Sequence, residues 1–304
     1  MTVAASIPAL PTVAAALAEA EERLAAAGVE SPRVDAEWLL AGILDVGRNA
    51  LALNAMRPLP EMTASRYADA TARRARREPL QRILGWEEFR GLRLRLTPDV
   101  LVPRPETELL VEWALDFVPA SASSPRATKR APLVVDIGTG SGCIACAIAH
   151  ARPDVEVIAF DVSAPAVATA GANVEALGLE RRVRLVVGDL TAAVGSGCVD
   201  AIVANLPYLP TGWLRDLAPE VRAHEPALAL DGGADGLDAI RRLVLDARRV
   251  LRAGGALVLE TAGDAQVRVA AALLRDAGFV KVETRDDLAG VNRFVAARTP
   301  EARP

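Results

Sequence analysis

The sequence is poor in cysteine and histidine and has no long apolar run. Its three cysteines form no disulfide framework. Two of them, Cys143 and Cys146, have the spacing of a redox motif, but they fall in a predicted helix and are more typical of small core residues. His150 and His224 have no neighbours at ligand spacing, so no metal site is expected. No window approaches about 18 uninterrupted apolar residues, so no membrane span is expected.

Neither sign of charge dominates the chain. It holds 35 Lys and Arg against 39 Asp and Glu, and the net charge of −4 argues against a broadly cationic surface for nucleic acid. A local cluster, Arg73, Arg74, Arg76 and Arg77, is interpreted as the solvated face of a helix. The first 24 residues lack the basic region of a signal peptide. With its thiols expected to be reduced, a cytoplasmic enzyme is favoured.

A chain of 304 residues predicts about two domains. Residues 1–78 are expected to form a small helical bundle, with helices over 12–27, from Ser31-Pro32 onward and over 60–77. Residues 79–104 form a predicted β-hairpin connector, because 80–84 and 89–96 alternate apolar and polar side chains. The second domain is expected over 105–304, with a helix over 106–118 and a mobile surface loop over 119–130.

From Pro132 onward, strand and helix patterns alternate. The expected strands are apolar runs, and they cover residues 133–136, 155–161, 183–187, 199–204, 256–260, 280–284 and 293–297. Apolar strands separated by helices predict an α/β fold whose mostly parallel sheet is covered on both faces. The last two strands follow each other closely, so one of them is expected to run antiparallel.

A glycine-rich loop follows the first of these strands, and its residues are Asp136, Gly138, Thr139, Gly140, Ser141 and Gly142. Glycine lets the backbone pass close to a ligand. Two details favour S-adenosylmethionine over NAD as that ligand. Asp136 at the strand end can meet the cationic amino group of a methionine moiety, and the glycines lack the G-x-G-x-x-G spacing.

Acidic residues also follow the next two strands. Asp161 can accept hydrogen bonds from both ribose hydroxyls, a feature shared with NAD enzymes. Asp189 can accept from an adenine amino group, with Leu190 beside the ring. Each of these residues also fits a helix cap or a turn, but the set at successive strand ends favours a nucleoside site.

The strand over 199–204 ends abruptly in Asn205, Leu206, Pro207 and Tyr208. A polar amide, a proline that fixes the backbone and an aromatic ring stand where an α/β sheet binds its ligands, beyond the carboxyl ends of its strands. Alone, the segment could be only a strand exit and turn.

Two further segments carry a more specific signal. They are Pro103-Arg104-Pro105-Glu106-Thr107-Glu108 and the run from Glu225-Pro226 to Gly232-Gly233 and Asp235-Gly236. With them the chain resembles the HemK/PrmC-type protein-(glutamine-N5) methyltransferases, which modify the Gly-Gly-Gln loop of bacterial peptide-chain release factors. The resemblance covers nearly the whole chain, from Glu78-Pro79-Leu80-Gln81 to Glu260 and Gln266.

The resemblance implies a Rossmann-like class I methyltransferase domain, a short hairpin and a helical domain that docks the release factor. It implies S-adenosylmethionine as methyl donor, with S-adenosylhomocysteine as product. Asn205, Leu206, Pro207 and Tyr208 would be catalytic, and Asn205 would also contact the cofactor. The same four residues, with Arg104, Pro105 and Glu106, would bind the substrate, and Glu106 and Glu108 would shape its entrance. The two glutamates also suit a helix N-terminus.

The implied chemistry needs orientation rather than a strong base. An amide nitrogen is a poor nucleophile, so two acceptors, the Asn205 side-chain oxygen and the carbonyl of residue 206, would hold its N–H bonds and present the lone pair. The chain departs from the family where Leu206 replaces the first proline of Asn-Pro-Pro-Tyr and where Arg82 replaces a tyrosine. The change at Leu206 lies at the implied reacting centre and would bear on activity, whereas the change at Arg82 would affect only packing or docking.

Three alternatives remain at this stage. The same Asn-x-Pro-Tyr chemistry serves methylation of the exocyclic amine of adenine in nucleic acid, although the acidic balance argues against direct nucleic-acid binding. A glutamine of a ribosomal protein is a second protein substrate. A regulatory nucleoside-binding protein without catalysis is a third, against which Asn205 argues.

Overall fold

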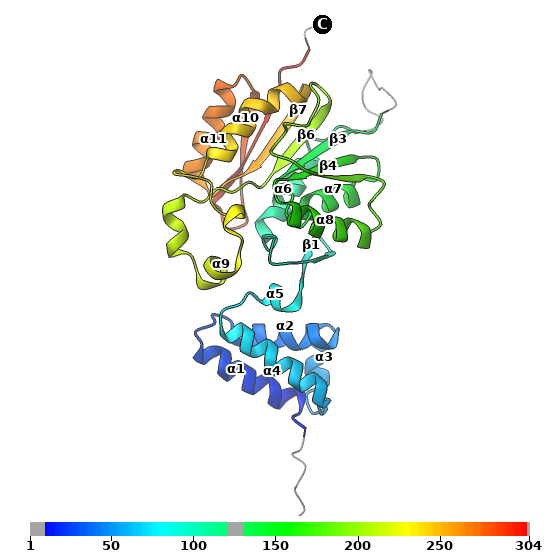
Figure 1. The fold of residues 1–304 in the computed structure, drawn as a ribbon, viewed down its shortest axis with the longest axis vertical. Helices are drawn as coiled ribbons and strands as arrows, with labels where there is room; N and C mark the ends of the chain where they lie inside the picture. Colours follow the sequence, from blue (N-terminus) through cyan, green and yellow to red (C-terminus); the bar gives the residue numbers. More distant parts are fainter. Residues whose placement is uncertain (1–9, 121–129, 303–304) are drawn as a thin grey trace, which may run out of the picture. The chain divides into compact units, whose positions relative to one another are not determined.

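The computed structural model describes residues 10–120 and 130–302. The chain forms two compact units, coloured along the sequence in Figure 1. The helical unit comprises the chain up to Gly85 and also Ala218–His224, while the sheet unit comprises Trp86–Leu217 and the chain from Glu225. These ranges differ from the predicted 1–78, 79–104 and 105–304, because the hairpin belongs to the sheet unit and one later segment belongs to the helices. Most of the loop predicted over 119–130 lies outside the described residues.

The helical unit follows the apolar pattern of its sequence. Its helices are α1 (Val13–Ala26), α2 (Pro32–Leu44), α3 (Arg48–Leu53), α4 (Glu61–Ala75) and α5 (Leu80–Leu84). Thr12 caps α1, since its hydroxyl oxygen accepts from the Ala15 N–H at 3.2 Å. Leu24, Leu39 and Leu40 are fully buried at the centre of the bundle. The short helix α3 was not predicted.

Residues 80–84 were predicted as a strand, and that prediction is wrong. They form the single-turn helix α5, which begins after Pro79 and ends at Gly85 in a left-handed conformation with φ 80°. A segment of five residues is too short to separate the period of a strand from that of a helix, and the proline before it and the glycine after it decide for a helix.

The arginine cluster on α4 is not simply a solvated face. Arg74 is buried and pairs with Asp35 at 2.6 Å and with Glu220 at 3.1 Å. Arg77 pairs with the same Glu220 at 2.6 Å. Glu220 lies on α9 (Pro219–His224), so these ion pairs hold a segment that is distant in sequence within the helical unit.

In the sheet unit, a hairpin does lie within residues 79–104, but its strands are β1 (Trp86–Phe89) and β2 (Leu92–Arg95), paired antiparallel. Its turn interrupts the single strand predicted over 89–96. Helix α6 (Pro105–Leu115) follows, with Pro105 in its first turn. The Glu108 carboxylate accepts from the Arg90 N–H in the hairpin turn at 2.8 Å. Glu108 therefore fixes the hairpin to α6.

The seven-stranded sheet has the order β5-β4-β3-β6-β7-β9-β8. Its strands are β3 (Leu133–Ile137), β4 (Glu156–Asp161), β5 (Val183–Val187), β6 (Val199–Ala204), β7 (Leu251–Glu260), β8 (Val280–Asp286) and β9 (Asn292–Arg298). The first five are parallel, and β9 runs antiparallel between β7 and β8. The predicted parallel sheet with an antiparallel partner at its end is confirmed.

Helices cover both faces of the sheet, as Figure 1 shows. α6, α7 (Cys143–Ala151) and α8 (Ala164–Ala176) pack on one face, and α10 (Asp238–Val250) and α11 (Asp264–Asp276) pack on the other. Neighbouring strand residues alternate between the two cores: Val134 points to the first and Val135 to the second. Cys143 and Cys146 lie in the first core, and burial raises both thiol pKa values to about 12.

No helix or strand was predicted for the segment between β6 and α10. It contains the 3-10 helices η1 (Thr211–Asp216) and η2 (Ala227–Ala229) on either side of α9. In the described part of the chain, no helix combines the length and the apolarity needed to cross a bilayer.

Candidate functional site

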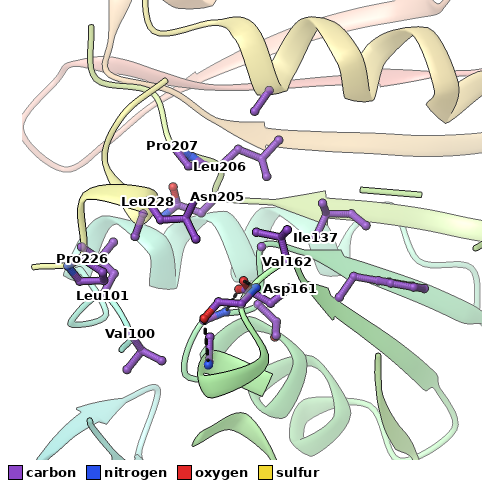
Figure 2. Close-up of a pocket in the computed structure, with 18 of the residues that line it drawn as sticks. Val100, Leu101, Ile137, Asp161, Val162, Asn205, Leu206, Pro207, Pro226 and Leu228 are labelled. Atoms are coloured by element: carbon purple, nitrogen blue, oxygen red, sulfur yellow. Dashed lines mark hydrogen bonds between the residues drawn. The ribbon is translucent and has the colours of Figure 1, made fainter. Parts of the chain in front are cut away.

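A pocket of about 800 Å³ opens at the carboxyl ends of β3, β4, β5 and β6. Figure 2 shows Asn205, Leu206 and Pro207 along one part of its wall and Asp161 and Val162 along another. Most of the predicted site residues line it, namely Arg104, Gly138, Thr139, Gly140, Ser141, Asp161, Asp189, Leu190, Asn205, Leu206 and Pro207. Asp136, Gly142, Pro105, Glu106 and Tyr208 are not among the lining residues.

The glycine loop turns tightly between β3 and α7. Gly138, Gly140 and Gly142 have φ values of 74°, 54° and 82°, which a residue with a Cβ rarely adopts. A Cβ at Gly138 would lie 3.2 Å from the Leu206 side chain, whereas one at Gly140 would meet nothing within 4 Å. Gly138 thus permits the close approach of the loop to the β6 exit, and Gly140 is needed for its backbone conformation alone.

Asp136 lies completely buried beneath this loop. Its Oδ2 accepts from the Thr139 hydroxyl at 2.6 Å and from the Ala145 N–H at 3.2 Å. Burial raises the pKa of the Asp136 carboxyl to about 7, although these two hydrogen bonds act in the opposite direction. Its Oδ1 has no hydrogen-bond partner within the described residues, and the same holds for the Ser141 hydroxyl.

Asp161 and Asp189 stand at the ends of β4 and β5. Asp161 holds the loops on both sides of it, since its oxygens accept from the Gly140 N–H and the Ser163 N–H, each at 2.9 Å. Asp189 pairs with Arg242 of α10, a partner that the sequence did not reveal. Both side chains keep additional lone pairs for a ligand in the pocket.

The backbone after β6 is held by the glycine segment that the sequence singled out. A Cβ at Gly232 would lie 2.7 Å from the Pro207 carbonyl oxygen, and one at Gly236 would overlap the Tyr208 carbonyl oxygen. The Gln266 amide donates to that same Tyr208 oxygen at 2.7 Å. The two glycines therefore permit a close approach to the backbone of residues 207–208, and the glutamine holds it by a hydrogen bond.

Leu206, the departure from the family pattern, is buried in the second core of the sheet unit. Its side chain faces the Gly138 position, as the contact above requires. Packing therefore restrains this residue where proline would restrain it through its ring.

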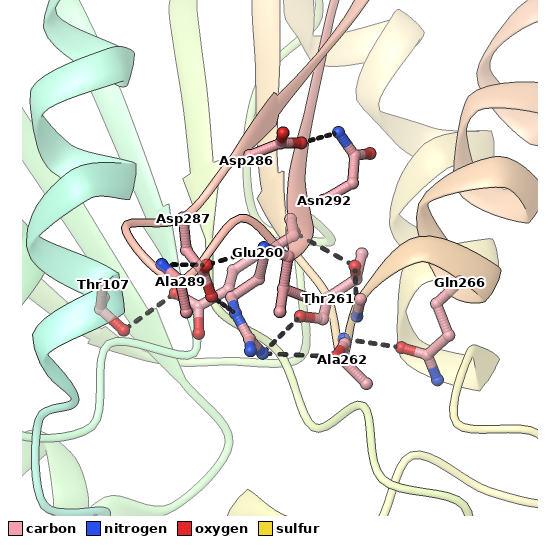
Figure 3. A network of polar contacts seen from close by, with 12 residues as sticks. Thr107, Glu260, Thr261, Ala262, Gln266, Asp286, Asp287, Ala289 and Asn292 are labelled. Carbon is pink, nitrogen blue, oxygen red and sulfur yellow. Dashed lines mark hydrogen bonds and ion pairs between the residues drawn. The ribbon is translucent and has the colours of Figure 1, made fainter.

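A polar network joins the β6 exit to α6 and β7. The Asn205 Nδ2 donates to the Thr107 hydroxyl oxygen at 3.0 Å, and the Thr107 hydroxyl donates to Glu260 Oε2 at 2.9 Å. Figure 3 shows the contact between Thr107 on α6 and Glu260 at the end of β7. The Tyr208 hydroxyl donates to Glu260 Oε1 over a longer distance of 3.4 Å.

Glu260 is 1% exposed, and burial raises its pKa to about 7. The hydrogen bond from Thr107 and the positive charge of Arg293 lower the same pKa, and the charge of Glu106 raises it. Arg293 itself pairs with Asp287 at 2.9 Å. Burial also raises the pKa of the Tyr208 hydroxyl, so the ring keeps its proton.

The segment before α6 contributes one lining residue of the predicted substrate group. Arg104 pairs with Glu225 at 3.3 Å, and Glu225 also accepts from the Val102 N–H at 3.3 Å. Pro105 is exposed and Glu106 is partly buried, both outside the pocket wall. Thr107, to which the sequence analysis gave no role, does line the pocket.

The residues under the pocket fit a cationic nucleoside of the S-adenosylmethionine type. A buried carboxylate oxygen without a partner, Asp136 Oδ1, lies next to the loop that walls the pocket, and such an oxygen suits an ammonium group. Gly138 and Gly140 line the same space, and a Cβ at Gly140 would meet nothing within 4 Å. Asp161 and Asp189 add two further acceptors along it.

Comparisons with known proteins agree with this fit. The PrmC N-terminal domain matches residues 15–85, and the methyltransferase small domain matches residues 124–213. Among solved structures, the hMettl16 catalytic domain in complex with MAT2A 3'UTR hairpin 1 is 17% identical, with a TM-score of 0.55 over 83% of this chain and 88% of that one. A methyltransferase from Pyrococcus furiosus is 19% identical, with a TM-score of 0.51 over 69% and 90%. These two likenesses concern the fold.

Relatives named release factor glutamine methyltransferase match almost the full length. The one from Cereibacter sphaeroides is 44% identical over 94% of this chain and 98% of its own. The one from Geobacter sulfurreducens is 42% identical over 90% and 92%, and the one from Moorella thermoacetica is 42% identical over 95% and 100%. The chain therefore belongs to the release factor glutamine methyltransferase family of enzymes, whose methyl donor is S-adenosylmethionine.

Proposed function

We propose that this enzyme methylates the side-chain amide nitrogen of the glutamine in the Gly-Gly-Gln motif of peptide-chain release factors. The observation that carries the proposal is the placement of Asn205, Leu206 and Pro207 in the wall of the pocket that the glycine loop also lines. The full-length likeness to relatives of that name supports the choice of substrate. We place the reaction in the cytoplasm, with no direct binding of nucleic acid.

Bound S-adenosylmethionine supplies a methyl group on a sulfonium centre. Asp136 is proposed to hold the amino group of the methionine moiety through its unpartnered Oδ1, over the loop of Gly138, Thr139, Gly140, Ser141 and Gly142. Asp161 accepts from the ribose hydroxyls. Asp189 accepts from the adenine amino group, with Leu190 beside the ring, and the ion pair with Arg242 orients the Asp189 side chain.

Asn205 and the Leu206 carbonyl are proposed to accept hydrogen bonds from the two N–H groups of the target amide. Held by both, the nitrogen presents its lone pair to the methyl group, and the developing positive charge is stabilised by two fixed oxygen dipoles. The Leu206 carbonyl is followed directly by Pro207, whose own carbonyl oxygen packs closely against Gly232. Tyr208 packs against the glutamine, and the methylated amide loses its extra proton to water without a dedicated base.

The substrate protein is proposed to meet two further parts of the chain. Arg104, Pro105 and Glu106 at the start of α6 contact the peptide around the glutamine. Residues 1–78 serve as the docking domain for the body of the release factor, an assignment that the match of residues 15–85 to the PrmC N-terminal domain supports.

Labelled S-adenosylmethionine tests the proposal directly. We expect the label on a release factor and on the Gly-Gly-Gln peptide after digestion, with a mass increase of one methyl group on the glutamine. A release factor whose motif glutamine is replaced by alanine is the matched control and should take no label. Label on a ribosomal protein or on nucleic acid, with none on the release factor, would overturn the proposal.

A further inference from the structure

The hydrogen bonds from Asn205 to Thr107 and from Thr107 to Glu260 form a relay with a fixed direction. In its ionised form the Glu260 carboxylate only accepts, and in that form it takes the single proton of the Thr107 hydroxyl at 2.9 Å. Thr107 then has only lone pairs to offer Asn205, and the atom that faces it at 3.0 Å is Nδ2. The direction of each bond follows from the acceptor at the end of the relay.

This direction decides which edge of the Asn205 amide faces away from Thr107. An amide turned by half a rotation would place Oδ1 against the Thr107 oxygen, two acceptors at hydrogen-bond distance with no proton between them. Because Thr107 is 2% exposed and Glu260 is 1% exposed, little solvent competes for these groups. A buried mismatch of this kind is unfavourable by about 1 to 3 kcal/mol, enough to select one orientation.

Glu260 is itself held in position from several elements. Its second oxygen accepts from Tyr208, which follows β6, and Arg293 of β9 supplies positive charge nearby. Arg293 is fixed in turn by Asp287 at 2.9 Å and by the Ala262 carbonyl at 3.3 Å. The relay therefore ends on a carboxylate whose two oxygens accept from two different elements.

We propose that Thr107 and Glu260 are positioning residues that orient the Asn205 amide so that its oxygen, and not its nitrogen, receives the substrate. The inference rests on the proposed function. It also states a rule of specificity: a side chain that offers N–H donors to Asn205 is accepted, and one that offers only an oxygen, such as glutamate, is rejected. Thr107 acts through Asn205 and does not touch the reacting atoms.

The first test replaces Thr107 by valine, which keeps the shape and removes the hydroxyl. We expect kcat to fall by about 10- to 100-fold, with cofactor affinity and KM for the release factor nearly unchanged. Thr107→Ser, which restores the hydroxyl, should recover most of kcat. Thr299→Val is the matched control, because it removes another buried threonine hydroxyl, one that donates to the Arg252 carbonyl at the opposite end of β7.

A second measurement reads the orientation without any turnover. The sequence has five asparagines, so protein with isotope-labelled asparagine gives few side-chain amide signals in NMR spectra, and the one that vanishes in Asn205→Asp belongs to Asn205. In Thr107→Val this signal should shift and its protons should exchange faster, while those of Asn173 and Asn292 stay unchanged. Thr299→Val should leave the Asn205 signal where it was.

Two results would overturn the inference: a Thr107→Val enzyme that keeps at least half of kcat, or one whose Asn205 signal neither moves nor exchanges faster. Failure of the proposed function has a different signature. In that case the wild-type enzyme does not label the Gly-Gly-Gln glutamine, whereas the Asn205 signal still responds to the loss of the Thr107 hydroxyl.

Discussion

Asp136 and Glu260 are two buried carboxylates at the carboxyl ends of strands in one sheet, and they differ in what they hold. Each is at most 1% exposed, and burial raises the pKa of each to about 7. Asp136 accepts from Thr139 and Ala145, three and nine residues along the chain. Glu260 accepts from Thr107 and Tyr208, which are 153 and 52 residues away.

This difference in hydrogen-bond partners assigns one carboxylate to the cofactor and the other to the residues that bind the substrate. Asp136 orders its own loop and keeps one oxygen without a partner, so it serves the cofactor side in our proposal. Both oxygens of Glu260 accept from side chains next to the proposed substrate position, those of Thr107 and Tyr208, and hold them in place. One carboxylate is a candidate ligand, whereas the other supports residues that face the ligand.

Removing Asn205 should impair substrate binding and transfer far more than cofactor binding, and this is the largest effect that we expect. Asn205→Ala deletes an acceptor for the target amide, so transfer should fall by about 1,000-fold or more, while S-adenosylmethionine still binds. Single-turnover methylation of a release factor and calorimetric titration of the cofactor measure the two quantities. Asn292→Ala, which removes an asparagine bonded to Asp286 on β8, is the control and should retain activity. Near-normal transfer by Asn205→Ala would refute the assignment.

Gly236→Ala should disturb the substrate side through the backbone. The new Cβ would overlap the Tyr208 carbonyl oxygen and the Gln266 amide, and φ at this position is 79°. We expect a loss of about 2 to 4 kcal/mol in the free energy of unfolding and a clear loss of transfer. Gly290→Ala isolates the conformational part, because Gly290 has φ 78° and open space around it. That control should lose only about 1 to 2 kcal/mol; equal losses in the two variants would argue against the steric contact.

Asp136→Asn should break the cofactor side and leave the loop in place. The asparagine oxygen can still accept from Thr139 and Ala145, but the unpartnered oxygen becomes an amide nitrogen that repels an ammonium group. Cofactor affinity should fall by about 10- to 100-fold, in line with the loss of a charge-assisted hydrogen bond. Titration calorimetry measures this, and affinity within twofold of wild type would remove Asp136 from the site. The rate of transfer at saturating cofactor should change little.

The contrast between partners that are near and partners that are distant in sequence also explains what the sequence could predict. The glycine loop, Asp136, Asp161 and the Asn205 segment follow strand ends, and strand ends can be located from apolar runs. The roles of Thr107 and of Arg242 depend on pairing across distant elements, which no local pattern encodes. Glu260 and Gln266 stood in the family resemblance without a physical role until their partners were visible. The strand predicted over 80–84 was wrong for a local reason: five residues are too few for their periodicity to distinguish a strand from a helix.

The smallest expected effect is the pH dependence of stability, which the two carboxylates share as long as no ligand is bound. Each has a folded-state pKa of about 7 above its unfolded value near 4, so the folded state binds more protons between these limits. Their contribution to stability is therefore present at low pH and lost as the pH rises through about 7. Relative to wild type, Asp136→Asn and Glu260→Gln should each gain a few degrees in Tm between pH 5 and pH 8.

Added S-adenosylhomocysteine should reverse that trend for Asp136 only. The ligand carries the same amino group and favours the ionised carboxylate, so its stabilisation of the wild type should grow with pH and be lost in Asp136→Asn. Glu260→Gln should respond to the ligand as wild type does, because the Glu260 oxygens face Thr107 and Tyr208. Thermal unfolding at four pH values with and without ligand measures this. If Glu260→Gln also lost the ligand response, Glu260 would have to be counted with the cofactor side.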